Sequence, residues 1–400
     1  MNLEQIRKDF PLLNNGKKII CFDNACSTLR PLSVINAISE YYQEYPVCAG
    51  RSSYSLAVSL TEKCEASRKL VAKFINTKNP KEIVFVKNAT EGINLVSHSL
   101  SLEKGDIVLT TDKEHNSNLV PWQMLKSKKG IVHKVVFSNE DNTFNFESFK
   151  EAMSSDVKLV AMVWTSNLDG VTNPAREIIE IAHQYGSKVL LDATQVAGHH
   201  KIDVADLDVD FLVFSGHKIL GPCGIGVLYG KMHLLEEMDP FLTGGGTVSY
   251  SDYDRHELLS APEKFEAGIQ DYAGILGLGE AIRYLEKIGF DNIARHEYEL
   301  NKFITSELGK NAFVKVIGPT DASQRGGVFS FWIEGMESHQ VAIMLEQMGG
   351  IMVRSGQHCV NSWFNARGIK SSVRASVYFY NTIDEAKIFV DAVNKITKLL

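Results

Sequence analysis

The sequence is organised around Phe211-Leu-Val-Phe-Ser215-Gly216-His217-Lys218, an apolar run followed at once by a hydroxyl, a glycine, an imidazole and a primary amine. The run predicts a buried strand whose end delivers Lys218 into a site. A lysine in such a place can form a Schiff base with an aldehyde cofactor. Because a lysine after a strand is more often a solvated loop residue, this interpretation depends on what the other strand ends supply.

The composition is that of an ordinary globular protein, with 44% hydrophobic and 22% charged residues. A net charge of −6 offers no basic footprint for nucleic acid or an anionic membrane. No apolar run approaches the roughly 18 residues of a transmembrane helix, and the first residues do not read as a signal peptide. The six cysteines lack zinc-site spacing and read as reduced thiols. We expect a cytoplasmic protein that binds no metal, nucleic acid or membrane.

Short, continuously apolar strands alternate with helical patterns from residue 82 onward. This alternation indicates an α/β protein whose parallel or mixed sheet is covered on both faces. Besides the opening strand, the expected strands cover residues 82–86, 106–110, 158–164, 188–191 and 225–229.

The two ends of the chain have patterns of their own. No domain boundary is evident before about residue 288, after which an amphipathic helix and short strands suggest a smaller α+β domain. The final helix begins at a capping box, Thr382-Ile-Asp-Glu385. The other expected elements are helices over 1–13, 31–45 and 58–76, and strands over 18–22, 327–332 and 373–380.

Polar residues follow the apolar strands. In parallel sheets, ligands bind beyond the carboxyl ends of the strands, so we expect these side chains to converge. They are Thr90, His115, Asn167, Asp192, Gln195, Ser215, His217 and Lys218.

Pyridoxal chemistry gives each of these residue types a use. Asp192 could hold a protonated pyridine nitrogen, or merely cap the next helix. Thr90 begins a helix whose free N–H groups favour a phosphate, although an ordinary N-cap is the stronger interpretation of this residue until the other strand ends are counted. Ser215 and His217 could complete the phosphate site, and His115 could lie over the ring and transfer protons, whereas each alone is commonly a loop residue.

A second constellation stands at Arg354-Ser-Gly-Gln-His-Cys359, with Arg374 further on. Among the six cysteines, Cys359 is the one flanked by an imidazole, a glycine and a nearby arginine, surroundings that favour a thiolate. The alternative is an inert small hydrophobe. Arg374 could bind a substrate carboxylate through its planar fork, or simply lie on the surface.

Taken together, the motifs resemble the Suf-type (group II) cysteine desulfurases, which belong to the class V aminotransferase family. The similarity runs from about residue 22 to residue 381. It rests on Asp192-Ala-Thr-Gln195, Phe214-Ser-Gly-His-Lys218, Gly221-Pro-Cys-Gly-Ile-Gly-Val-Leu-Tyr-Gly230, Phe265-Glu-Ala-Gly268, Arg354-Ser-Gly-Gln-His-Cys359 and Arg374-Ala-Ser.

The resemblance implies a class V aminotransferase-like fold (type I of the pyridoxal-phosphate-dependent transferases). Its large domain has a seven-stranded, mostly parallel sheet and would cover residues 17–288. The small α+β domain would cover 1–16 and 289–400 and carry the loop of the catalytic cysteine. The family is homodimeric, with the site near the subunit interface, and group II members pass sulfur to a docked acceptor protein.

The resemblance also implies roles for single residues in binding pyridoxal 5′-phosphate and L-cysteine. Lys218 would bind the cofactor aldehyde and later move the substrate α-proton. Cys359 would take the substrate sulfur as a persulfide and leave alanine, for iron–sulfur cluster or thio-cofactor assembly. By the same resemblance, Asp192 would bind the pyridine nitrogen, Gln195 the phenolic oxygen, and His115 would stack on the ring. The phosphate would be bound by Ala89-Thr90, Ser215 and His217. The substrate would be bound by Asn167, Arg354 and Arg374.

Two alternatives stay open at this point. One keeps the cofactor and changes the reaction, to a selenocysteine lyase acting on L-selenocysteine or another class V enzyme such as an epimerase or transaminase. The other is a non-catalytic scaffold of the same fold. Its support is the loss of two family hydroxyls, since Ala89 and Ile269 occupy positions where the family usually has threonine.

Overall fold

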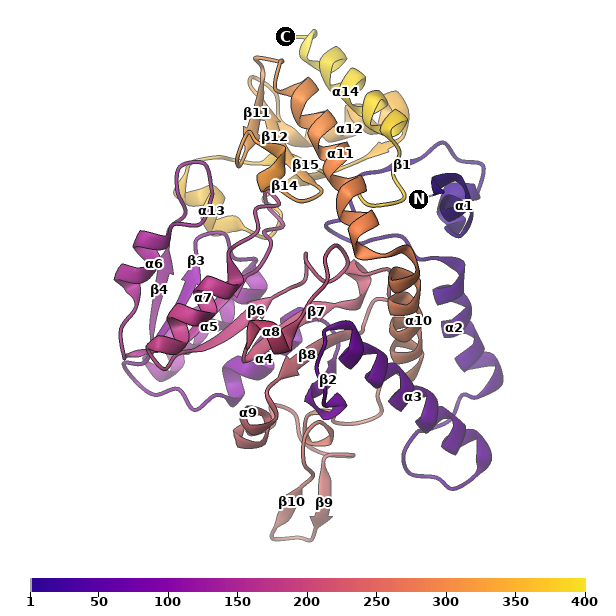
Figure 1. Cartoon of the computed structure of the whole chain (residues 1–400), viewed down its shortest axis with the longest axis vertical. Coiled ribbons are helices and arrows are strands. Elements are labelled where there is room, and N and C mark those ends of the chain that lie inside the picture. Colours follow the sequence, from indigo (N-terminus) through magenta and orange to yellow (C-terminus); the bar gives the residue numbers. More distant parts are fainter. Residues whose placement is uncertain (1) are drawn as a thin grey trace.

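The larger lobe is built on one seven-stranded sheet. The structure is a computed structural model that describes residues 2–400 (Figure 1). The strands, in spatial order, are β2 (Ile83–Val86), β8 (Gly226–Gly230), β7 (Phe211–Ser215), β6 (Lys188–Asp192), β5 (Val157–Val163), β3 (Ile107–Thr111) and β4 (Val132–Val136). Six strands of this sheet run in one direction, and β8 runs in the opposite direction. The predicted α/β fold with a seven-stranded, mostly parallel sheet is confirmed.

Several strands differ from the sequence prediction, among them the one predicted over 373–380, which is β15 (Ser372–Ser376). The edge strand β4 was not predicted, because His133 and Lys134 interrupt its apolar pattern and its first four residues are exposed or half-buried. The predicted strand over 18–22 shortens to β1 (Ile20–Cys21) and lies outside the large sheet. It pairs instead with β13 (Ile351–Met352), 331 positions further along.

Helices cover both faces of the sheet because successive strand side chains point to opposite faces. Leu212 and Phe214 of β7 pack in one apolar cluster with α3, α7 and α10. Phe211 and Val213 pack in another with α4, α5 and α9. The helices of this lobe are α2 (Leu32–Glu44), α3 (Ser55–Phe74), α4 (Ala89–Ser99), α5 (Val120–Lys129), α6 (Phe146–Ala152), α7 (Ala175–Gln184), α8 (Val204–Leu207), α9 (Met232–Glu237) and α10 (Tyr272–Ile288).

The smaller lobe has a four-stranded antiparallel sheet. Its order is β11 (Val314–Ile317), β12 (Val328–Ile333), β15 (Ser372–Ser376) and β14 (Arg354–Gly356). The helices α11 (Phe290–Leu308), α12 (Ser338–Gly349) and α14 (Ile383–Thr397) pack on it around a separate apolar cluster. The capping box of Thr382 and Glu385 is confirmed. The short helix α13 (Asn361–Ala366) lies apart from these helices, beside the larger lobe (Figure 1).

The remaining elements are short. A hairpin of β9 (Val248–Ser251) and β10 (His256–Leu258) projects from the larger lobe (Figure 1). The predicted helix over 1–13 is α1 (Leu3–Lys8) followed by a 3₁₀ turn, and residue 1 lies outside the described residues. The 3₁₀ turns are η1 (Pro11–Asn14), η2 (Pro80–Glu82), η3 (Asn116–Asn118), η4 (Gly216–Lys218), η5 (Glu263–Phe265) and η6 (Ala322–Gln324). Over residues 2–400, no helix is both long enough and apolar enough to cross a bilayer.

The domain division stays a proposal. Gly289, with φ of 83°, separates α10 from α11 close to the proposed boundary at residue 288. At the amino-terminal end of the chain, neighbouring segments pack against different lobes. Ile6 and Phe10 pack with the larger lobe, whereas Ile20 and Phe22 pack with the smaller one.

Candidate active site

The carboxyl ends of the strands meet around one cavity of about 240 Å³. Cross-strand register places Asp192 beside Val163 of β5, and Ser215 beside Gly226, where the reversed strand β8 begins. Nine residues proposed for the cofactor from the sequence line this cavity, namely Ala89, Thr90, His115, Asn167, Asp192, Gln195, Ser215, His217 and Lys218. The cavity wall also contains five residues that the sequence did not single out, Cys26, Asn88, Ser117, Val163 and Thr194.

Lys218 ends η4, directly after β7, and its amine donates a hydrogen bond to the carbonyl oxygen of Ala25. Burial and, after it, the charge of Arg374 lower the pKa of Lys218 from 10.5 to about 8. A substantial share of the amine is therefore neutral near physiological pH. A neutral amine is the form that attacks an aldehyde or removes a proton.

Asp192 and Gln195 both line the cavity, and Gln195 also contacts Ala25. Asp192 is the last residue of β6 and is 4% exposed, and its Oδ1 accepts a hydrogen bond of 3.0 Å from the N–H of Thr194. Gln195 Nε2 donates to the Ala25 carbonyl oxygen at 2.8 Å, so this oxygen accepts from both Gln195 and Lys218. A buried carboxylate at a strand end requires a cationic or hydrogen-bonding partner.

The start of helix α4 forms another part of the cavity wall. Asn88 caps the helix by accepting from the N–H of Glu91 at 3.0 Å, and Ser215 Oγ accepts from the N–H of Ala89 at 2.9 Å. The cap approaches β8 so closely that a Cβ on Gly226 would lie 2.6 Å from the Asn88 Cα, which explains the glycine. Thr90 adds its hydroxyl, 2.7 Å from that of Ser117. This part of the wall combines a helix N-terminus with hydroxyl groups, a combination that suits an anion.

His115 lies in the turn after β3. Its Nδ1 accepts from the backbone N–H of Ser117 at 3.1 Å, so the neutral ring carries its proton on Nε2. Burial lowers the pKa of His115; Asp192 opposes this shift, and Lys218 adds to it. The neighbouring Glu114 holds the turn by accepting from the N–H of Val163, and burial raises the pKa of Glu114 to about 7.

The two predicted arginines come from the smaller lobe and lie beside the cavity, not in its wall. Arg354 on β14 and Arg374 on β15 are cross-strand partners. Arg374 is buried, and its Nη1 donates to the carbonyl oxygen of Asn167 at 3.0 Å. Both guanidinium groups approach Asp23, at 3.4 Å for Arg374 and 3.3 Å for Arg354. Arg354 also donates a hydrogen bond to Cys26 Sγ.

Cys359 is exposed on the loop after β14. Its carbonyl oxygen accepts from the N–H of Asn116 at 2.7 Å, and the preceding carbonyl, that of His358, accepts from Asn167 Nδ2 at 2.8 Å. The loop is therefore tied to the neighbour of His115 and to a residue of the cavity wall. The structure thus brings the two predicted constellations together.

Several polar atoms beside the cavity are buried without a hydrogen-bond partner among residues 2–400. They include Oδ1 of Asn167, Oγ1 of Thr194 and Nε of Arg374. Buried polar groups are normally paired, so such atoms are suited to a bound ligand. Asp23 and Cys26, which the sequence did not identify, follow the short strand β1. The strand-end rule that found Asp192 could also have found them.

Comparison with known proteins identifies the family. The Aminotransferase class-V family model matches residues 20–389. A probable cysteine desulfurase of Synechocystis is 42% identical over 394 residues, covering 97% of this chain and 94% of that protein. The chain belongs to the class V aminotransferase family and, within it, to the cysteine desulfurases.

Solved structures of the family agree with this membership. The apo structure of cysteine desulfurase from Thermococcus onnurineus has a TM-score of 0.95 at 38% identity, covering 99% of this chain and 98% of that one. The cysteine desulfurase CsdA of Escherichia coli has a TM-score of 0.92 at 31% identity, covering 100% and 99%. Since these relatives are enzymes, membership counts against the non-catalytic scaffold.

Pyridoxal 5′-phosphate is the cofactor of this family, and the residues present fit it. The cavity offers an amine for an aldehyde, a carboxylate for a pyridinium, and an amide for a phenolic oxygen. The part of its wall at the start of α4 offers hydroxyl groups and a helix N-terminus for a phosphate. The loss at Ala89 leaves the hydroxyl groups of Thr90 and Ser215 in the wall, and Ile269 is 75% exposed and does not line this cavity.

Proposed function

We propose that the protein converts L-cysteine to L-alanine and takes the sulfur onto Cys359 as a persulfide. The observation that carries the proposal is the junction of two parts: a cavity holding Lys218 and Asp192, and a Cys359 loop hydrogen-bonded to Asn116 and Asn167. Cys359 does not line the cavity itself, and these two hydrogen bonds hold its loop beside the cavity wall. A substrate-binding cavity without a nearby thiol would suit a transaminase equally well.

The proposal gives each cavity residue a task in holding the cofactor. Lys218 would bind the aldehyde, Asp192 the pyridine nitrogen and Gln195 the phenolic oxygen. His115 would stack on the ring. The start of α4 would hold the phosphate through the backbone of Ala89 and Thr90 and through the side chains of Thr90, Ser215 and His217. When bound, pyridoxal phosphate supplies the electron sink that lets a substrate amino acid lose its α-proton.

Arg374, Asn167 and Arg354 hold the substrate carboxylate in this scheme. Arg374 Nη1 donates a hydrogen bond to the backbone carbonyl oxygen of Asn167. The buried Nε of Arg374 has no hydrogen-bond partner within residues 2–400. Lys218, freed from the aldehyde, takes the α-proton. Its pKa of about 8 suits a general base working near neutral pH.

The Cys359 thiolate then attacks the substrate sulfur. An S–S bond forms, the Cβ–S bond of the substrate breaks, and the electron pair of that bond stays with carbon. Protonation of that carbon gives the methyl group of alanine, and no external oxidant is required. Because Cys359 is exposed, the sulfane sulfur is accessible to a thiol of a second protein.

We further propose a cytoplasmic homodimer of the Suf type that serves iron–sulfur cluster or thio-cofactor assembly through a sulfur-acceptor protein. An exposed apolar surface supports the dimer. A second hollow shares Thr90 and Ser117 with the cavity wall and is also lined by Val120, Pro121 and Met124. Val120 and Met124 are 44% and 48% exposed. A second copy covering them would also lie over the phosphate end.

The direct test is turnover of the purified protein carrying its cofactor. Incubation with L-cysteine and a reductant should give alanine and sulfide in equal amounts. Parallel reactions with L-selenocysteine and cysteine sulfinate separate a desulfurase from a selenocysteine lyase. Absence of alanine from L-cysteine, with cofactor bound, would falsify the proposal.

The lowered pKa of Lys218 makes a prediction about cofactor uptake. Only the neutral amine attacks an aldehyde, and its fraction rises as pH passes the pKa of about 8. After removal of the cofactor, the rate of rebinding should rise about tenfold between about pH 7 and pH 9, then level off. Stopped-flow absorbance measures it, and Nα-acetyl-lysine, with an ordinary amine, should keep accelerating to higher pH. A protein rate that climbs in parallel with that of the free amine contradicts the prediction.

Replacing Arg374 with lysine tests the carboxylate site. Lysine keeps the charge but loses the planar fork that can bind Asn167 and a carboxylate together. We expect KM for L-cysteine to rise on the order of tenfold while cofactor content is unchanged. The matched control is Arg283→Lys, since Arg283 lies on the exposed side of α10 and pairs only with Glu280 within residues 2–400. Equal KM values for the two variants would remove Arg374 from substrate binding.

A further inference from the structure

The backbone of the Cys359 loop is in an unusual conformation. His358 and Cys359 are consecutive non-glycine residues with φ of 51° and 60°, in the left-handed region. Side chains rarely adopt this conformation, and it persists only where the surroundings hold it. The contacts that fix the loop therefore also decide where the Cys359 thiol lies.

Three polar contacts fasten the helix that follows the loop, α13, to the larger lobe, and in the first of them Asn116 Nδ2 donates to Asn361 Oδ1 at 2.8 Å. Arg367 Nη2 forms an ion pair with Asp112 Oδ2 at 2.9 Å. Trp363 Nε1 donates to Asn142 Oδ1 at 3.3 Å. The Arg367 guanidinium also lies 4.5 Å from the centre of the Trp363 ring, so the last two contacts support one another.

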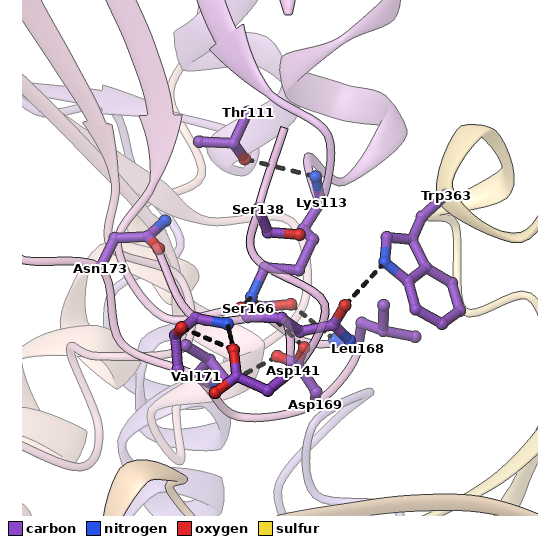
Figure 2. A network of polar contacts seen from close by, with 12 residues as sticks. Thr111, Lys113, Ser138, Asp141, Ser166, Leu168, Asp169, Val171, Asn173 and Trp363 are labelled. Carbon is purple, nitrogen blue, oxygen red and sulfur yellow. Dashed lines mark hydrogen bonds and ion pairs between the residues drawn. The ribbon is translucent and has the colours of Figure 1, made fainter. Parts of the chain in front are cut away.

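The partner of Trp363 is held in turn by a buried lysine. Asn142 has φ of 68° and is 3% exposed, and its carbonyl oxygen accepts from Lys113 Nζ. Lys113 is itself 1% exposed and pairs with Asp169 at 3.3 Å. Figure 2 shows Lys113 reaching the turn of Asp169 and Val171, with Trp363 approaching the same network from α13.

The Asp169 turn connects the lysine to the Cys359 loop by a second route. Asp169 Oδ1 accepts from the N–H of Val171 at 3.0 Å and so closes the turn in which Asn167 lies. Asn167 donates to the carbonyl oxygen of His358. Leu168, in the same turn, packs in an apolar cluster with Val360, Trp363 and Phe364. The Lys113 ammonium therefore contacts two segments: the one around Asn142, which contacts α13, and the turn of Asp169, which contacts the Cys359 loop.

Asp112 and Lys113 directly follow β3 and lie in the turn that also contains His115. We propose that Asp112 and Lys113 are positioning residues, which fix the Cys359 loop relative to His115 and the cavity through Arg367 and through Asn142 and Trp363. The inference rests on the proposed function, since it concerns the geometry of sulfur transfer. It assigns the turn after β3 two tasks, one in the cavity and one in orienting the thiol.

The test separates substrate binding from sulfur transfer in the cofactor-loaded protein. The main variant is Lys113→Met, with Trp363→Phe as a milder change that removes the indole N–H and some volume but keeps an aromatic ring. Lys231→Met is the control, because Lys231 pairs with Asp208 and Asp210 at the end of β7 and β8 that lies away from the cavity wall. After L-cysteine is added, absorbance reports substrate binding, and mass spectrometry of the Cys359 peptide reports sulfane sulfur.

We expect Lys113→Met to leave the absorbance change and KM within about twofold of wild type, and to slow persulfide formation on Cys359 by at least about tenfold. Trp363→Phe should slow it about threefold. Lys231→Met should match wild type in both measurements. If Lys113→Met does not fold, Trp363→Phe and Asp112→Asn decide by the same two readings.

Two outcomes overturn the inference. Wild-type rates of persulfide formation in folded variants would show that the network does not position Cys359. A parallel loss of cofactor or of the absorbance change would show a general structural role. Both differ from failure of the proposed function, in which the wild-type protein itself forms no persulfide on Cys359.

Discussion

Replacing Cys359 with serine is expected to lower alanine formation from L-cysteine by at least about a hundredfold, with cofactor content unchanged. A hydroxyl is a far weaker nucleophile toward sulfur than a thiolate, so the S–S bond does not form. The structure explains why binding should survive. The loop is held through the backbone carbonyl oxygen of Cys359, and this oxygen is retained in the variant.

Cofactor absorbance, the absorbance change with L-cysteine, and alanine yield measure the effect of Cys359→Ser. Cys48→Ser is the matched control, because Cys48 is also an exposed free thiol but lies between α2 and α3. The control should run at the wild-type rate. Unimpaired alanine formation in Cys359→Ser would remove this residue from its role, and equal loss in both variants would point to nonspecific damage.

Replacing Lys218 with alanine is expected to abolish turnover, by at least about a thousandfold, and to leave no covalently held cofactor. Lys218 is the amine of the cavity wall, so no other lysine among the residues lining it can substitute. Lys218→Arg is the matched variant. It keeps a cation beside Asp192 and Ala25 but cannot form a Schiff base, and it should be equally inactive.

Borohydride reduction followed by peptide mapping checks this assignment directly. In the wild-type protein the reduced cofactor should appear on the peptide containing Lys218, and in neither variant should it appear. Cofactor trapped on a different lysine would contradict the assignment, whatever the activity. If Lys218→Arg kept most of the turnover, the role of the amine as base would be wrong.

Continuous apolar strands were the part of the fold most readily predicted from the sequence. β2 and β7 are buried throughout, and β5 and β6 are buried apart from Lys158 and Lys188 near their starts, so these strands are almost continuously apolar and polar site residues follow them. That regularity predicted most of the cavity wall. It failed for β4, an edge strand whose outer residues face solvent and break the pattern.

Contacts between distant parts of the chain were much harder to predict. Arg367 meets Asp112 and Trp363 meets Asn142 across more than 200 residues, and no local pattern indicates either pair. Lys113 was not singled out from the sequence, where it stands between two acidic residues, yet it is buried. Its charge is tolerated because Asp169 and a backbone carbonyl surround it. Cys26 was overlooked, although the strand predicted over 18–22 ends shortly before it.

The pairing of β1 with β13 has a consequence for how the chain matures during synthesis. Strand β1 and Asp23 are made among the first residues, but their partners Met352 and Arg374 are made among the last. The large sheet can form while the ribosome is still adding residues, since its strands end at residue 230. The part that contains Cys359 and Arg374 can form only after these residues have been made, so under the proposed function a shorter nascent chain could bind the cofactor but could not transfer sulfur.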